Sequence, residues 1–168
     1  MPMLLYMCSS IGRKVRGRAA DSGRSHRCSI ETGGAKDLLR DPGNLLPGSL
    51  LFDYGDSLRF GASTAVEDEA DLSKVNFDLE YFESYTRGFL SELGSKITEA
   101  EVKLLPLSAL ILTFECGIRF LTDYLNGDTY FKIHYANQNI IRAKNQLKLV
   151  QDINSKLDEM TKIVAKYA

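Results

Sequence analysis

Apolar residues recur at helical spacing through the second half of the chain. Five of them follow one another at intervals of three and four, the spacing that places side chains on one face of an α-helix: Leu79, Phe82, Tyr85, Phe89 and Leu93. Gly94 stands where helix C-termini favour glycine, and either Asn76 or Asp78 can cap the N-terminus. The pattern predicts an amphipathic helix over residues 79–93.

A second helix is predicted to begin at Thr98, because Thr98 and Glu101 have the spacing of a capping box. Pro106 has no backbone N–H, so we expect it to bend or break this helix. From residue 107 to residue 125, apolar side chains cover most of the helix circumference, which is typical of a helix buried among others. The helix is predicted to end at Asn126-Gly127.

A third helix is predicted from about Asn137 to Lys166, with Lys and Gln on its outer side. Its inner stripe comprises seven residues: Ile140, Ala143, Leu147, Val150, Asn154, Leu157 and Val164. Residues 49–75 carry Asp-Tyr-Gly-Asp, a Gly-Ala-Ser-Thr segment and an acidic run, and we interpret this stretch as a loop. The predicted fold class is therefore mainly α.

The first 48 residues differ in composition from the rest of the chain. They contain six of the ten Arg and seven of the thirteen Gly, but none of the eight Phe. They show no sustained period of 2 or 3.6 residues, so they cannot bury enough apolar surface to offset the entropy of ordering. We therefore expect most of residues 1–37 to be poorly ordered, with a boundary near Pro47-Gly48.

Properties of the whole chain exclude several classes of function. The net charge of −1 favours neither nucleic acid nor a membrane surface, and no 18-residue apolar run is free of charges. Cys8, Cys28 and Cys116 are odd in number and lack metal-ligand spacing, which favours a reducing compartment. The apolar stretch near Met1 is too short for a secretory signal. We expect a cytoplasmic protein with no nucleic-acid partner and no membrane partner.

Two blocks of the sequence carry a resemblance to a known family. One is Pro-Gly-Ser-Leu-Leu-Phe-Asp-Tyr-Gly-Asp-Ser-Leu-Arg-Phe-Gly-Ala-Ser-Thr at residues 47–64, and the other is Arg-Phe-Leu-Thr-Asp-Tyr-Leu-Asn-Gly-Asp-Thr-Tyr at residues 119–130. Over about residues 41–153 the chain resembles the C-terminal part of aminoglycoside phosphotransferase-like kinases, most of all the bacterial N-acetylhexosamine 1-kinases. The resemblance implies that residues 41–168 are the helical C-terminal lobe of a protein-kinase-like fold.

The resemblance also implies which parts of the kinase this chain lacks. Asp41 matches the metal-binding aspartate of the family, although its neighbours depart from the family pattern. Residues 1–40 contain no glycine-rich nucleotide loop, no V-A-I-K-like lysine and no H-x-D-x-x-x-x-N catalytic loop. Codons for residues 34–41, read one nucleotide later, can encode a Glu-Pro-Lys-Ile-Cys-Phe-Val-Ile strand like that of the family. We interpret residues 1–40 as a poorly ordered segment or an out-of-frame remnant before a truncated lobe.

By the resemblance, Arg119 and Tyr130 match positions that bind the sugar acceptor. An arginine on so apolar a helix also needs a partner, because an unpaired buried charge is costly, and an ion pair with Asp123 is the alternative. Asp128 either faces the sugar or forms the turn that ends the helix. Asp53 and Asp56 are interpreted as structural residues near a helix terminus rather than as metal ligands.

The activity implied by the resemblance is ATP-dependent phosphorylation of the anomeric hydroxyl of an N-acetylhexosamine, with Mg²⁺ and ATP as cofactors. Because the chain lacks the nucleotide lobe and the catalytic loop, we expect it to bind neither cofactor alone and to be inactive alone. The alternative is a non-catalytic helical module that binds a sugar or packs against a separately encoded nucleotide-binding lobe.

Overall fold

Four α-helices make up most of residues 49–168, the part that the computed structural model describes. They are α2 (Leu50–Gly61), α3 (Leu79–Leu93), α4 (Glu99–Leu125) and α5 (Gln138–Tyr167), with short 3-10 turns at Leu72–Lys74 and Gly94–Lys96. This part contains no β-strand, only an isolated antiparallel bridge between Ser63 and Phe77, so the mainly α class is confirmed. The predictions for residues 1–40 and for Asp41 lie outside the described residues.

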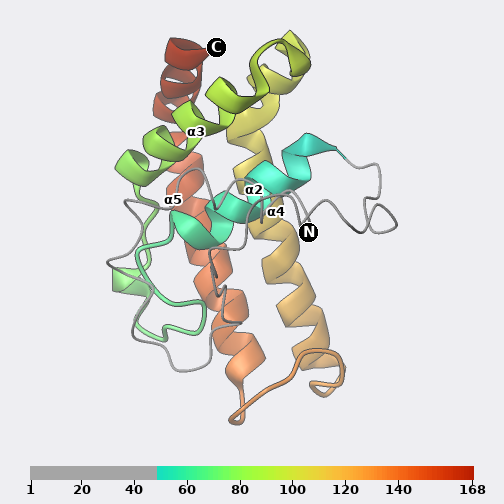
Figure 1. Cartoon of the computed structure of the whole chain (residues 1–168). Helices are drawn as coiled ribbons and strands as arrows, with labels where there is room; N and C mark the ends of the chain where they lie inside the picture. Colours follow the sequence, from blue (N-terminus) through green and yellow to red (C-terminus); the bar gives the residue numbers. More distant parts are fainter. Residues whose placement is uncertain (1–48) are drawn as a thin grey trace, which may run out of the picture. The chain divides into compact units, whose positions relative to one another are not determined.

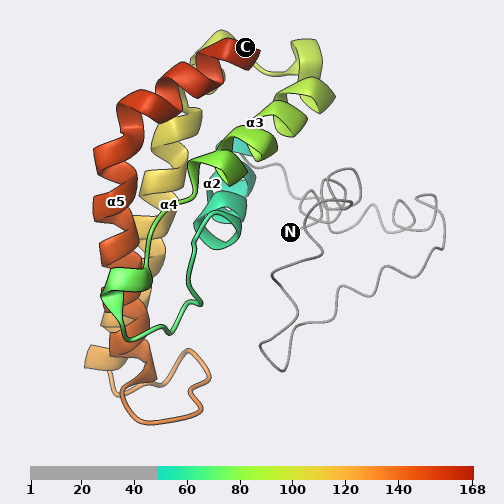
Figure 2. The ribbon, with the colours of Figure 1, turned by 90° about the vertical axis from the view of Figure 1, so that its left-hand side faces the viewer.

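The helices α4 and α5 form a long antiparallel pair, connected by the loop at residues 126–137 (Figure 1). The shorter helices α2 and α3 lie on one side of this pair, as Figure 2 shows. The helix α4 contacts α2 and α5, and α3 contacts α5. This arrangement leaves one side of α4 uncovered by any of the described helices.

The first predicted helix, α3, has the predicted ends. Asp78 rather than Asn76 is its N-cap, and the Asp78 carboxylate accepts the N–H groups of Glu80 at 2.9 Å and Tyr81 at 3.0 Å. Gly94 follows with a φ of +51°, a conformation that costs glycine little because it has no Cβ. Phe82, Tyr85 and Phe89 of the predicted apolar face are buried.

The second predicted helix, α4, begins with the predicted capping box. The Glu101 N–H donates to Thr98 Oγ1 at 3.3 Å, and the Thr98 N–H donates to Glu101 Oε2 at 2.9 Å. The helix then runs unbroken through Pro106, so a break at that residue is wrong. Proline removes only one backbone hydrogen bond, and the buried Pro106 packs within a 27-residue helix held by α2 and α5.

The prediction of a loop over residues 49–75 is wrong for its first half, where α2 forms. Ser49 caps this helix by accepting the N–H of Leu51 at its Oγ, at 3.3 Å. Gly55, in the middle of Asp-Tyr-Gly-Asp, serves a close helix crossing rather than a turn. A Cβ at Gly55 would lie 2.6 Å from the carbonyl oxygen of Ser108 in α4.

Aromatic side chains of α2 and α3 form the centre of the core. The Tyr54 ring lies 4.8 Å from that of Phe89 and 6.4 Å from that of Phe82, centroid to centroid. The Tyr54 hydroxyl and Thr86 Oγ1 are hydrogen-bonded at 2.7 Å. Burial raises the pKa of Tyr54 against the opposing effect of this hydrogen bond, so the phenol is protonated. The bond therefore satisfies a polar group inside an apolar core.

The last helix, α5, lies within one residue of its predicted ends, but its buried face differs from the predicted stripe. Of that stripe, Ala143 and Val164 are buried, whereas Asn154 is exposed and was assigned to the wrong face. Other buried apolar residues of α5 are Leu149, Ile153 and Met160. Because α5 contacts both α3 and α4, it buries a broader face than a single stripe.

The prediction that α4 is buried around most of its circumference is wrong. Six large apolar side chains of this helix are between 39% and 74% exposed, and we call them the α4 apolar face: Leu104, Leu107, Ile111, Phe114, Ile118 and Leu125. The opposite side of the helix, which includes Leu105, Ala109 and Phe120, is buried. Hydrophobicity alone does not reveal which side of a helix has neighbours.

By length and composition, α4 also meets the criteria for a membrane-spanning helix, with 39% of its most apolar window buried. A core helix of a soluble protein meets the same criteria, so this finding is weak evidence for a membrane. Cytoplasmic location stays a prediction from the sequence.

Candidate functional site

The residues assigned to sugar binding come from the end of α4 and from the loop that follows it. Arg119 lies in the last two turns of α4, while Asp128 and Tyr130 lie in the loop before α5. Near the start of the loop, Gly127 and Asp128 both have positive φ, of +86° and +57°. This left-handed pair reverses the chain directly after the helix, as the Asn126-Gly127 stop signal predicts.

Asp123, in the last turn of α4, holds this loop in place. Its buried carboxylate accepts four hydrogen bonds of 2.8–3.0 Å, from the backbone N–H groups of Thr129, Tyr130 and Phe131 and from the side-chain amide of Asn139. Burial disfavours the charged carboxylate, but these donors outweigh burial and lower the pKa of Asp123 below its usual value. The loop is therefore fixed to the ends of α4 and α5 by one ionised side chain.

Arg119 and Tyr130 are brought together at the surface. Arg119 Nη2 lies 3.4 Å from the Tyr130 hydroxyl, and the guanidinium carbon lies 5.8 Å from the centre of the Tyr130 ring and 5.5 Å from that of Phe131. The Arg119 side chain is 48% exposed and Tyr130 is 72% exposed. Arg119 is thus not the buried charge that the sequence suggests, and its ion-pair partner is Glu115, at 3.6 Å, rather than Asp123.

Asp128 takes part in the turn. Its carboxylate accepts the Asn139 side-chain amide at 2.9 Å, and its N–H donates to the Asp123 carbonyl at 2.9 Å. No hydrogen bond or ion pair joins Asp128 to Arg119 or Tyr130 within residues 49–168. The turn-forming alternative for Asp128 accounts for these contacts.

A polar network near this site was not predicted from the sequence. Glu67, in the loop after α2, accepts Arg59 Nη1 at 2.7 Å, and its other carboxylate oxygen lies 3.8 Å from Arg142 Nε. Arg142 Nη1 donates to Asn139 Oδ1 at 3.2 Å, and Asn139 reaches Asp123. Because Arg59 and Arg142 are 83 residues apart, no local sequence signal links them.

The buried Nε of Arg142 makes no hydrogen bond, because 3.8 Å to Glu67 is an ion-pair distance and not a hydrogen-bond distance. The Arg142 guanidinium carbon lies 5.4 Å from the centre of the Phe120 ring. The ring and the carboxylate compensate part of the cost of burying the charge.

Asp53 and Asp56 both lie in α2. Asp56 accepts Arg59 Nε at 3.0 Å, and Asp53 lies in the first turn of the helix, where a negative charge is favourable. Residues 49–168 contain no group of three or more His, Cys, Asp or Glu side chains placed to hold a metal ion. Cys116 is a free thiol whose pKa is raised to about 11 by burial, so it is a weak nucleophile.

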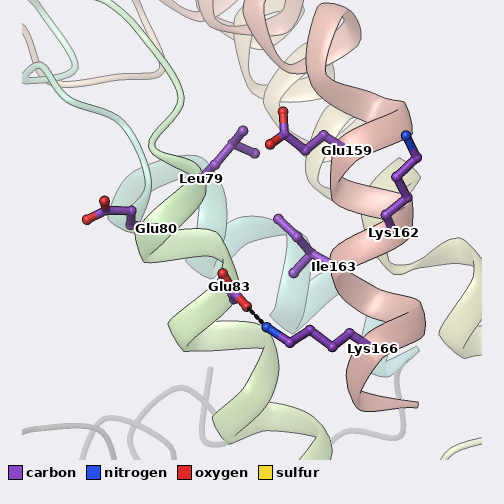
Figure 3. Close-up of a pocket in the computed structure, with 7 residues that line it drawn as sticks. All are labelled: Leu79, Glu80, Glu83, Glu159, Lys162, Ile163 and Lys166. Carbon is purple, nitrogen blue, oxygen red and sulfur yellow. Dashed lines mark hydrogen bonds and ion pairs between the residues drawn. The ribbon is translucent and has the colours of Figure 1, made fainter.

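The groove in Figure 3 lies elsewhere, between the start of α3 and the last turns of α5. It has a volume of about 460 Å³ and is lined by Leu79, Glu80, Glu83, Glu159, Lys162, Ile163 and Lys166. Lys166 Nζ pairs with Glu83 Oε1 at 2.7 Å across it. The groove is shallow, and it contains none of the residues assigned to sugar binding.

The site at the end of α4 therefore combines an arginine of the helix with a tyrosine of the fixed loop, and both side chains are exposed to solvent. The hydroxyl groups of a ligand can accept hydrogen bonds from the guanidinium, and they can donate hydrogen bonds to the phenol or accept them from it. No protein-family model matches this chain.

Proposed function

We propose that this chain is the C-terminal, sugar-binding part of an ATP-dependent sugar kinase that resembles the N-acetylhexosamine 1-kinases. The observation that carries the proposal is the exposed Arg119–Tyr130 pair, whose two residues belong to the second block of resemblance. The kinase-like fold and the activity are inferences from the resemblance.

The chemistry of the pair suits a sugar. Arg119 has five N–H donors in a planar fork, and its contacts with Tyr130 at 3.4 Å and Glu115 at 3.6 Å are long and exposed. A ligand that brings several hydroxyl groups can replace these contacts at little cost, because exposed ion pairs contribute only about 0–1 kcal/mol.

The support beneath the pair favours a preorganised site. Asp123 fixes the backbone N–H of Tyr130, and Asn139 ties Asp123 and Asp128 to the start of α5. A loop whose backbone is held in place before binding loses less conformational entropy on binding.

Catalysis requires parts that this chain lacks. Phosphoryl transfer needs ATP, Mg²⁺ and the acceptor hydroxyl to be held together, with a base near the hydroxyl. In our proposal these parts come from a separate nucleotide-binding lobe, so the chain alone binds neither Mg²⁺ nor ATP. Asp41 is the residue that would join such a metal site.

The experiment is an NMR titration of the purified chain with N-acetylglucosamine and N-acetylgalactosamine. We expect the NMR signals of Arg119 and Tyr130 to shift as sugar is added. The dissociation constant should be on the order of millimolar, because a few hydrogen bonds of about 1–3 kcal/mol each supply the binding free energy. Arg119→Ala and Tyr130→Phe should weaken binding, by about 10-fold or more for the arginine. Lys103→Ala, at the exposed start of the same helix, is the matched control.

Enzyme assays separate the kinase from the alternative of a non-catalytic module. The chain alone should show no sugar-dependent ATP consumption with Mg²⁺. After addition of the missing lobe from a complete relative, Arg119→Ala should impair sugar use by about 1.5–3 kcal/mol and leave ATP affinity unchanged. Sugar binding without any restored turnover would favour the non-catalytic module, and absence of sugar binding would overturn the sugar-binding role in both.

A further inference from the structure

We infer that the α4 apolar face is a homodimer interface, where α4 of one chain packs against α4 of a second copy. The inference goes beyond the proposed function and does not depend on it. The face consists of Leu104, Leu107, Ile111, Phe114, Ile118 and Leu125, all exposed by 39% or more.

The spacing of the face is that of a coiled-coil seam. Successive members are separated by three and four residues in alternation, and the half-buried Leu121 fills the single gap between Ile118 and Leu125. Seven positions thus follow a heptad pattern over three heptads, from residue 104 to residue 125. A solvent-facing helix side has no need of such a pattern, whereas a helix that packs against another helix requires it.

The charged residues beside the α4 apolar face are paired within α4, so a second helix can cover the face. Lys103 pairs with Glu99 at 2.7 Å, and Glu115 pairs with Arg119 at 3.6 Å, each within α4 itself. No member of the face is charged, so packing it against another apolar surface buries no unpaired ion.

The size of the face is close to the lower limit for a specific interface. With about 150–250 Å² for a fully exposed large side chain, the six residues expose on the order of 500 Å² of apolar surface per chain. Two such faces together approach the roughly 1,000 Å² that marks a specific interface, before any neighbouring side chains are added.

A second copy is the occupant that best fits the face. The partner must offer an apolar ridge of matching spacing over about 30 Å, the length of some 20 helical residues. Residues 1–48 have no sustained helical period and cannot offer such a ridge, whereas α4 of another copy offers it by identity. A twofold axis makes the same patch serve both chains, as in most homodimers.

A lipid bilayer fits the face less well. Glu115 is exposed near the middle of α4 and Arg119 is exposed one turn further along, and a spanning helix would carry the Glu115 charge into the hydrocarbon core. The opposite side of α4 is covered by α2 and α5, so lipid could contact only one side of the helix.

The test is the mass of the full chain in solution, measured by sedimentation velocity over a wide range of concentration. We expect twice the mass of the 18.8 kDa chain. Ile111→Glu and Ile118→Glu should each weaken the dimer by 100-fold or more with unchanged helix content by circular dichroism, because both side chains project from the described fold. Phe60→Glu is the matched control, since Phe60 is 71% exposed on α2 and lies outside the face.

A second measurement uses the wild-type chain alone. The methyl NMR signals of Leu107, Ile111 and Ile118 should move with protein concentration, while those of the buried Leu149 and Ile153 stay in place. A monomer at all concentrations would overturn the inference. So would a dimer that survives both Glu substitutions, or a monomer that binds to phosphatidylcholine vesicles through this face.

Discussion

Asp123 is a buried carboxylate that holds the loop of the candidate site in place. It accepts N–H donors from three consecutive residues of the loop, and the middle one is Tyr130. These donors stabilise the ionised carboxylate in the folded state more than water does in the unfolded chain, so the pKa of Asp123 is lowered. The position of Tyr130 beside Arg119 thus depends on the charge of Asp123.

A prediction at this scale concerns acid stability. The lowered pKa means that Asp123 stabilises the fold at a pH above its unfolded value of about 3.9, and that this stabilisation is lost as the pH falls through the folded pKa. Asp123→Asn should therefore lower the free energy of unfolding at pH 7, and the curves of the two proteins should converge in acid. Urea denaturation between pH 7 and pH 3 measures this.

The matched control for this prediction is Asp158→Asn, because Asp158 is exposed on α5 and makes no hydrogen bond within residues 49–168. Its substitution should leave the free energy of unfolding within about 0.5 kcal/mol of the wild type. Equal losses for Asp123→Asn at pH 7 and at pH 3 would contradict the role assigned to the ionised carboxylate.

At the scale of elements, the crossing of α2 over α4 depends on a residue without a side chain. Gly55 brings the backbone of α2 against the carbonyl of Ser108, and the side chain of Leu112 lies 3.1 Å from the place of a Gly55 Cβ. Gly61, at the end of the same helix, faces the Tyr81 hydroxyl, 2.7 Å from the place of its Cβ. A methyl group at Gly55 would therefore displace backbone atoms of Ser108, whereas one at Gly61 would displace only the side chain of Tyr81.

The prediction is that Gly55→Ala destabilises the protein more than Gly61→Ala. Helix propensity alone would make alanine up to about 1 kcal/mol more favourable in α2. At Gly55 the clash is with backbone of α4, so we expect a net loss of about 1–3 kcal/mol as the helices separate. At Gly61 the tip of Tyr81 can rotate away at a smaller cost.

Thermal denaturation of both variants, followed by circular dichroism, measures the difference. Each glycine is the control for the other, because both lie in α2 and both gain one methyl group. A Gly55→Ala variant as stable as the wild type would show that α2 and α4 approach less closely than the structure has them.

At the scale of the whole molecule, residues 49–168 contain their own hydrophobic core. Members of it come from all four described helices and include Tyr54, Phe89, Leu105 and Leu149. The polar links between Glu67, Arg142 and Asn139 are also internal to this unit. The core and these polar links therefore join residues that all lie within 49–168.

We therefore predict that a chain beginning at Ser49 folds by itself. It should unfold cooperatively on heating, with a thermal midpoint within about 3 °C of the full-length value, since a 1 kcal/mol change corresponds to about 2–8 °C in domains of roughly this size. Non-cooperative unfolding of this shorter chain would show that residues 1–48 contribute to the core.

Features that depend on residues close together in the chain could be predicted from the sequence. Apolar spacing placed α3, the capping box placed the start of α4, and Asn126-Gly127 placed its end. The approach of Tyr130 to Arg119 was also predictable, because a reversed chain directly after a helix returns toward the last turns of that helix. Each of these features is decided by hydrogen bonds or sterics within about a dozen residues.

Which surfaces meet depends on contacts between residues that are far apart in the chain. Gly55 in Asp-Tyr-Gly-Asp resembles a turn residue until Ser108 lies against it, 53 positions away, and so α2 was interpreted as a loop. The apolar residues of α4 do not distinguish its covered side from its exposed side, because transfer from water favours burial of either side equally. One side of α4 is buried because α2 and α5 pack against it, and the α4 apolar face stays exposed because neither helix reaches it.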